Sequence, residues 1–130
     1  MNKISQGIEE LLNMYKSYKI SPEQAISDQY DFLIDQIKDE TDASVLIHAL
    51  DKDISDLMYL DVYFMFFAYK KAIQLDPVNK GLIEDFIYYV DIHSGPDWEQ
   101  EVNKVRMYLD HHEIEKAGKE SLKIDYNKWD

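Results

Sequence analysis

A row of aspartates is the first feature of this 130-residue chain whose residue type and spacing indicate chemistry. Its members, here called the aspartate stripe, recur at steps of three and four residues: Asp28, Asp31, Asp35 and Asp39. On a helix they fall within roughly 80° of one side, opposite an apolar face. Because like charges at this spacing destabilise a helix, the stripe favours electrostatic recognition of a basic surface. The alternative is an ordinary solvated helix face.

A second acidic group follows in the same part of the chain and consists of Asp51, Asp53 and Asp56. Residues 21–61 hold two bases and eleven acids, which gives −9 of the total formal charge of −12. We predict that both acidic groups bind a partner, with Tyr30 beside the stripe supplying contact area.

The charge also indicates what kind of partner to expect. Nucleic acids and anionic membranes bind proteins of the opposite sign, so neither is predicted as a ligand. A basic protein is predicted instead, such as a toxin or a nucleic-acid-binding enzyme. In composition the chain is similar to immunity proteins that act against nucleases, and to inhibitors that mimic nucleic acid.

Catalytic and metal-binding patterns are weak in this sequence. It has no cysteine, no serine in a Gly-x-Ser-x-Gly motif and no glycine-rich phosphate loop. None of its four histidines has a glutamate three residues earlier. His111 and Glu115, one turn apart on a predicted helix, would supply only two metal ligands. We therefore predict no catalytic site, no metal and no cofactor.

The most apolar stretch, LMYLDVYFMFFAY at residues 57–69, predicts a central buried helix. It is too short to span a membrane, which takes about 20 apolar residues. The predicted helix has about twenty residues, from a cap at Asp53 or Ser55 to the stop at Asp76-Pro77. We expect Asp61 to lie on a solvent-exposed edge of this helix or to pair with a neighbouring side chain. The alternative is a ligand-binding or catalytic pocket that uses the aromatic residues near Asp61.

Periodicity and capping residues predict the remaining elements. The motif Ser21-Pro22-Glu23-Gln24 is typical of a helix start. The C-terminal residues alternate between apolar and polar, which predicts an extended tail. The predicted helices are a first to near Tyr18, a second to about Lys38, a third over 43–50 capped by Thr41 or Asp42, a fifth after Asn79, and a sixth from Trp98 that ends before Gly118.

Together these elements predict an all-α fold. We expect a single-domain bundle of about six antiparallel helices over residues 1–118, with an extended tail over 119–130 packing on it. The absence of cysteine and of a signal peptide predicts a cytoplasmic protein.

The segment AYKKAIQLDPVN, residues 68–79, resembles the second helix and exit turn of a tetratricopeptide repeat. Tyr69, Ala72 and Pro77 stand at its aromatic, small and proline positions, whereas Met65 and Asp53 depart from the pattern. The resemblance implies antiparallel helix pairs, here as a degenerate repeat, and protein binding.

The predicted function is a non-enzymatic acidic module that docks on and neutralises a basic partner protein, as an immunity protein or inhibitor does. The alternative is a tetratricopeptide-like adaptor or scaffold that holds a peptide in a groove. Ionic strength separates the two, because an acidic docking face weakens steeply with salt and an apolar groove does not.

Overall fold

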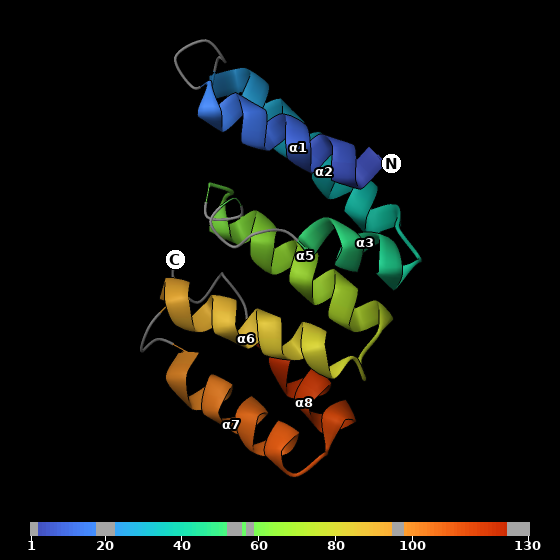
Figure 1. The fold of residues 1–130 in the computed structure, drawn as a ribbon, viewed down its shortest axis with the longest axis vertical. Coiled ribbons are helices and arrows are strands. Elements are labelled where there is room, and N and C mark those ends of the chain that lie inside the picture. Colours follow the sequence, from blue (N-terminus) through green and yellow to red (C-terminus); the bar gives the residue numbers. More distant parts are fainter. Residues whose placement is uncertain (1–2, 18–22, 52–55, 57–58, 95–97, 125–130) are drawn as a thin grey trace. The chain divides into compact units, whose positions relative to one another are not determined.

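A computed structural model describes residues 3–17, 23–51, 56, 59–94 and 98–124. These residues form helices and turns without a strand, which confirms the all-α fold. The contacts divide the chain into two compact units, Met1–Ala68 and Tyr69–Asp130, which are described separately. Within the described residues, no helix has both the length and the apolar character needed to cross a membrane. The helices are α1 (Lys3–Lys16), α2 (Glu23–Asp39), α3 (Ala43–Leu50), α5 (Val62–Leu75), α6 (Lys80–Ser94), α7 (Glu99–Asp110) and α8 (Ile114–Ser121) (Figure 1).

In the first unit, α1 and α2 lie side by side and antiparallel, and α3 also packs on α1 (Figure 1). Gly7 sets how closely the first two helices approach. A Cβ atom at this position would lie 2.4 Å from Cδ2 of Leu33, which is fully buried. The second helix ends at Asp39, within one residue of the prediction, while its predicted capping serine and proline lie outside the described residues.

The central apolar helix is shorter than predicted. Helix α5 begins at Val62 and not near residue 55, because the Asp61 carboxylate caps it: Oδ1 of Asp61 accepts a hydrogen bond from the Phe64 amide at 3.2 Å. The predicted caps, Asp53 and Ser55, lie outside the described residues. The predicted stop is confirmed, since the helix ends at Leu75, directly before Asp76-Pro77.

Two other predicted caps are confirmed. The carboxylate of Asp42 accepts from the backbone amide and the hydroxyl of Ser44, and α3 starts at Ala43. The hydrogen bond from the Ser44 hydroxyl, and to a lesser extent the one from the Ser44 amide, lower the pKa of Asp42. Asn79 Oδ1 accepts from the Leu82 amide at 3.1 Å at the start of α6.

The sixth predicted helix is two helices in the structure. Helix α7 ends at Asp110, and His112 has a positive φ of 60°, which breaks the helix before α8 begins. The prediction that one helix continues and ends before Gly118 is therefore wrong, because Gly118 is buried inside α8. The predicted tail boundary at residue 119 also falls inside α8, and residues 125–130 lie outside the described part. The predicted buried face of α7 is confirmed: Trp98, Val102, Val105 and Leu109.

Gly118 faces the turn between α5 and α6, and we expect Gly118→Ala to destabilise the fold. Its new Cβ would lie 2.3 Å from the Pro77 carbonyl oxygen, a backbone atom that cannot rotate away. Overpacking of this kind costs about 1–3 kcal/mol, more than the gain of about 1 kcal/mol in helix propensity. The matched control is Gly81→Ala in α6, whose Cβ would meet only Asn79 Oδ1 at 3.7 Å. Urea denaturation should show opposite signs for the two variants; two stabilised variants would contradict the packing.

Candidate functional site

The four aspartates of the stripe are all exposed along α2. On the opposite side of the helix, Leu33 and Ile37 are fully buried, so the structure confirms the predicted amphipathic arrangement. Asp28 accepts a hydrogen bond from Nε2 of Gln24 at 2.9 Å. No cation among the described residues forms an ion pair with any of the four carboxylates.

In the second unit, by contrast with the stripe, several acidic residues form ion pairs with lysine or arginine side chains. The described pairs are Asp91 with Arg106, Glu113 with Lys116 at 3.2 Å, Glu115 with Lys119 at 3.5 Å, and Glu120 with Lys104 at 3.8 Å and Lys123 at 3.0 Å. The first unit carries thirteen acids and five bases (−8), and the second thirteen acids and nine bases (−4). Uncompensated negative charge is thus concentrated on the first unit, where the stripe lies.

Phe32 is a further surface residue of α2 that the sequence interpretation missed. Its side chain is 44% exposed. On the helix it lies about 100° from Asp31 and only about 20° from Asp39, so it borders the stripe. An exposed aromatic residue beside a charged rim is the usual composition of a protein interface. The available signal was its angle, because Phe32 lies away from the apolar arc centred on Leu33 and Ile37.

A hollow of about 320 Å³ lies between α1 and α2 beside Phe32, here called the α1–α2 hollow. The side-chain amide of Gln29 bridges the two helices there: Nε2 donates to the Gly7 carbonyl at 3.2 Å and to Oε2 of Glu10 at 3.1 Å. The hollow is lined by Lys3, Gln6, Gly7, Glu10, Gln29 and Phe32.

The second acidic group is only partly within the described residues. Asp51 is exposed and caps the C-terminal end of α3, where a negative charge is unfavourable to the helix dipole. Asp56 is half-buried, and Asp53 lies outside the described residues. Its predicted role in partner binding therefore stays a prediction.

Tyr30 has an internal role in the first unit. Its hydroxyl lies 2.9 Å from the Tyr15 hydroxyl and accepts a hydrogen bond from the Asp61 amide at 2.6 Å. Its ring packs on Phe64 with the centroids 5.3 Å apart. Burial, and then the hydrogen bond to Tyr15, raise the pKa of Tyr30 well above its usual value. Tyr30 thus links α1 and α2 to the start of α5, and its predicted contribution to a partner's contact area stays a prediction.

We expect Tyr30→Phe to lower the free energy of unfolding by about 1 kcal/mol, because it removes the acceptor of the Asp61 amide and the partner of the Tyr15 hydroxyl. The ring stays, so the packing on Phe64 should survive. Urea denaturation measures the loss. An unchanged stability would mean that water replaces both hydrogen bonds without cost.

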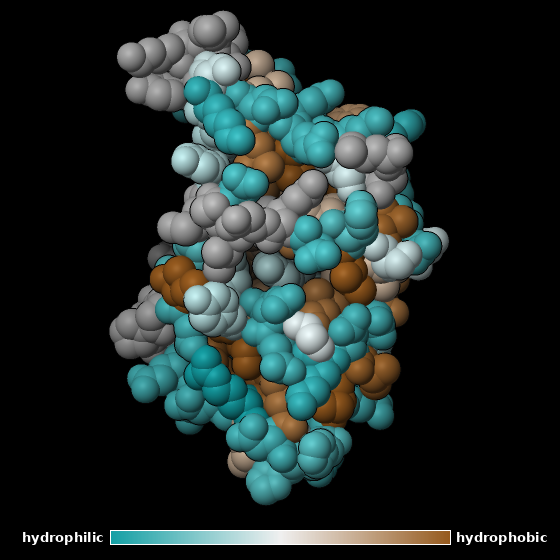
Figure 2. Space-filling model, in the orientation of Figure 1, coloured by the Kyte–Doolittle hydropathy of each residue, from teal (hydrophilic) through white to brown (hydrophobic). Residues whose placement is uncertain are grey.

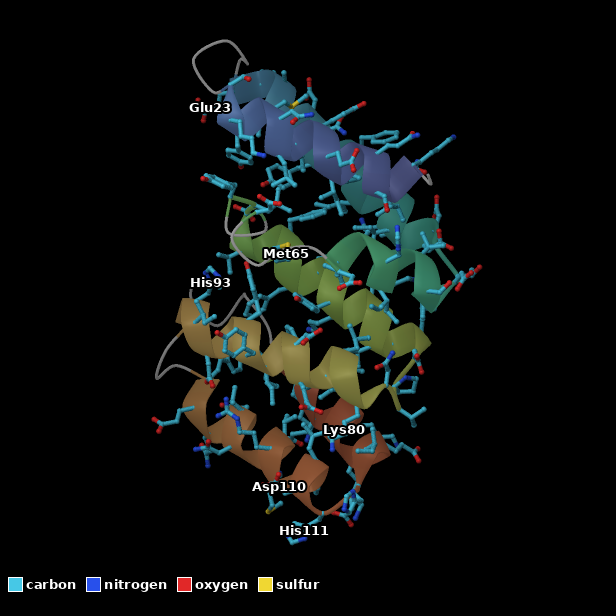
Figure 3. All side chains as sticks on the ribbon, in the orientation of Figure 1. Glu23, Met65, Lys80, His93, Asp110 and His111 are labelled. Carbon is cyan, nitrogen blue, oxygen red and sulfur yellow. The ribbon has the colours of Figure 1, made fainter. Side chains whose placement is uncertain are left out.

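In the structure Asp61 caps a helix, and His111 and Glu115 lie on opposite sides of a helix break. The Asp61 side chain is exposed and is used as a helix cap. His111 and Glu115 do not share a helix, since α7 ends at Asp110, before His111, and Glu115 belongs to α8, which begins at Ile114; Figure 3 labels His111 at the turn between α7 and α8. Across the described residues, no group of three or more metal-ligating side chains is placed to hold an ion.

A larger hollow, of about 500 Å³, lies between α6 and α7 in the second unit, here called the α6–α7 hollow. Figure 3 labels two of its lining residues, Lys80 at the start of α6 and Asp110 at the end of α7. Tyr88 lines it and is 58% exposed. Arg106 also lines it and is held by Asp91. The lining mixes both signs of charge. On the face of the molecule in Figure 2, hydrophobic side chains lie interspersed among hydrophilic ones.

The residues that resemble a tetratricopeptide repeat have packing roles in the second unit. Tyr69 and Ala72 are buried, and the Tyr69 ring lies 5.5 Å from that of Phe86 and 5.7 Å from that of Tyr89. Burial, and then the charge of Asp85, raise the pKa of Tyr69 to about 12. No family model, curated protein or solved structure matches the chain. The aspartate stripe, Phe32 and the two hollows are therefore the features from which a function is inferred.

Proposed function

We propose that this chain is a non-enzymatic protein-binding module that docks on a basic partner protein through α2 and neutralises it, in the manner of an immunity protein or inhibitor. One observation carries the proposal: the four carboxylates of the stripe are exposed and form no ion pair with a described cation. The proposal includes a cytoplasmic location, in keeping with the absence of cysteine.

The physical reason is that such a stripe costs stability in the free protein. Like charges three and four residues apart on a helix repel by a few tenths of a kcal/mol per pair. A basic surface removes that repulsion on binding. At physiological ionic strength, charges act over a Debye length of about 8 Å, so a concentrated stripe steers a basic partner better than the same charge dispersed.

Phe32 adds apolar contact area to the proposed interface. Charged rims mainly increase the association rate, whereas buried aromatic anchors slow dissociation. Phe32 borders the stripe and is already partly exposed, so a partner that covers it gains apolar contact. The proposed docking surface therefore consists of the stripe as rim and Phe32 as anchor, with Asp51, Asp53 and Asp56 as a second acidic group.

The alternative is a tetratricopeptide-like adaptor that binds a peptide. The α6–α7 hollow, with the exposed Tyr88, favours this alternative, since an exposed aromatic side chain can cover an extended segment. Its charges are mixed, so peptide binding there would depend little on salt.

Capture from an extract of the native cell, at low and at high ionic strength, tests the proposal. We expect a basic protein to be retained at low salt and released at high salt, and its own activity to fall in proportion to the chain added. Retention of a neutral or acidic protein that high salt does not release would contradict the proposed function and favour the adaptor.

A further inference from the structure

The α1–α2 hollow combines an aromatic ring, a carboxylate and one lysine side chain within one unit. We infer that this hollow receives a single arginine side chain of the basic partner, with the guanidinium hydrogen-bonded to the Glu10 carboxylate and stacked on the Phe32 ring. This inference rests on the proposed function and deepens it, because it assigns the partner's anchoring residue.

The Glu10 carboxylate is held in place before any partner binds. Gln29 Nε2 donates to Oε2 of Glu10 at 3.1 Å and also to the Gly7 carbonyl at 3.2 Å, so the amide ties the carboxylate to both helices. No described cation forms an ion pair with Glu10. A carboxylate accepts about four hydrogen bonds, so this one keeps acceptor sites for a planar donor.

The aromatic residue of the hollow favours arginine over lysine. Phe32 is 44% exposed, so a planar cation can lie on its ring. A guanidinium stacks on an aromatic face and donates two parallel hydrogen bonds to a carboxylate, whereas an ammonium group is strongly hydrated and donates as a point charge. Ring and carboxylate lining one hollow therefore suit a guanidinium.

Two residues limit what the hollow admits. Gly7, which lines the hollow, lets α2 approach closely, since a Cβ there would meet Cδ2 of Leu33 at 2.4 Å. Lys3 lines the same hollow and repels a cation. A bound arginine must therefore place its head at Glu10 and away from Lys3, and removal of the Lys3 charge should strengthen binding.

The test is a titration of the ¹⁵N-labelled full chain with N-acetyl-arginine methylamide, followed by NMR, with N-acetyl-lysine methylamide as the second probe. We expect amide shifts centred on Gly7, Glu10, Gln29 and Phe32, with a Kd in the millimolar range for so small a probe. Arginine should bind more tightly than lysine. Glu10→Gln should weaken arginine binding by about three- to fivefold, and Lys3→Gln should strengthen it. Glu23→Gln, an exposed acid of α2 outside the hollow, is the matched control and should leave it unchanged.

Two results would overturn the inference. One is the absence of shifts at the hollow; the other is a set of shifts along the stripe that is equal for both probes and unaffected by Glu10→Gln. Either result leaves the proposed function standing if a captured basic partner still binds in a salt-dependent way. Conversely, if arginine binds in the hollow but binding of the partner does not depend on salt, the inferred arginine site would be supported and docking through the stripe would be refuted.

Discussion

Changing the four aspartates of the stripe together to asparagine is expected to slow association with the basic partner by about tenfold or more at low salt. The same change should flatten the dependence of the association rate on ionic strength, because steering charges act mainly through encounter. The dissociation rate should change less, since Phe32 remains. The fold should survive, because all four side chains are exposed and lie opposite the buried Leu33 and Ile37. Loss of like-charge repulsion should stabilise α2 slightly.

A matched control separates the stripe from net charge. Both the stripe variant and the control change the formal charge from −12 to −8, since each removes four acids. Association rates at two ionic strengths should fall for the stripe variant alone, with circular dichroism as the check on folding. A folded stripe variant with unchanged affinity would move the docking surface to Asp51, Asp53 and Asp56. The control removes four exposed acids of the second unit: Glu84→Gln, Glu99→Gln, Asp110→Asn and Glu113→Gln.

The exposure of the stripe was predictable from sequence because helical periodicity alone decides it. Leu33 and Ile37 must face the core, and the aspartates then point away from it. Phe32 was missed because its type suggests a core residue, although its angle on the helix places it at the stripe. The α1–α2 hollow could not be predicted, because it depends on how closely α2 approaches Gly7, and this distance is set by tertiary packing.

Helix boundaries were predictable where a capping residue acts alone. Asp42 and Asn79 each accept a hydrogen bond from an amide of the following first turn, as their types suggest. The predicted start of α5 was wrong. The apolar run begins before Asp61 and therefore favours a longer helix, whereas in the structure Asp61 caps the helix. The break after α7 has only a weak local signal: histidine adopts a positive φ more often than most residues other than glycine, as His112 does here, but such residues remain uncommon.

The core should respond much more strongly than the surface. Phe64→Ala is expected to lower the free energy of unfolding by about 3–5 kcal/mol, the usual cost of emptying a buried aromatic site. The Phe64 side chain is 1% exposed and supports the ring of Tyr30 at 5.3 Å. From sequence, Phe67 has equal weight in the same apolar run, but the structure leaves it half-buried, so its loss should cost less.

Phe32→Ala on the surface is the matched control for this comparison, and it should change the free energy of unfolding by no more than about 0.5 kcal/mol. Urea denaturation of the two variants therefore tests whether Phe64 belongs to the core and Phe32 to the docking surface. A small loss for Phe64→Ala would mean that the cavity collapses, and a large loss for Phe32→Ala would mean that its ring supports the helix pair. In that second case Phe32 is a packing residue, and the proposed interface would have to rely on the charges of the stripe without an aromatic anchor.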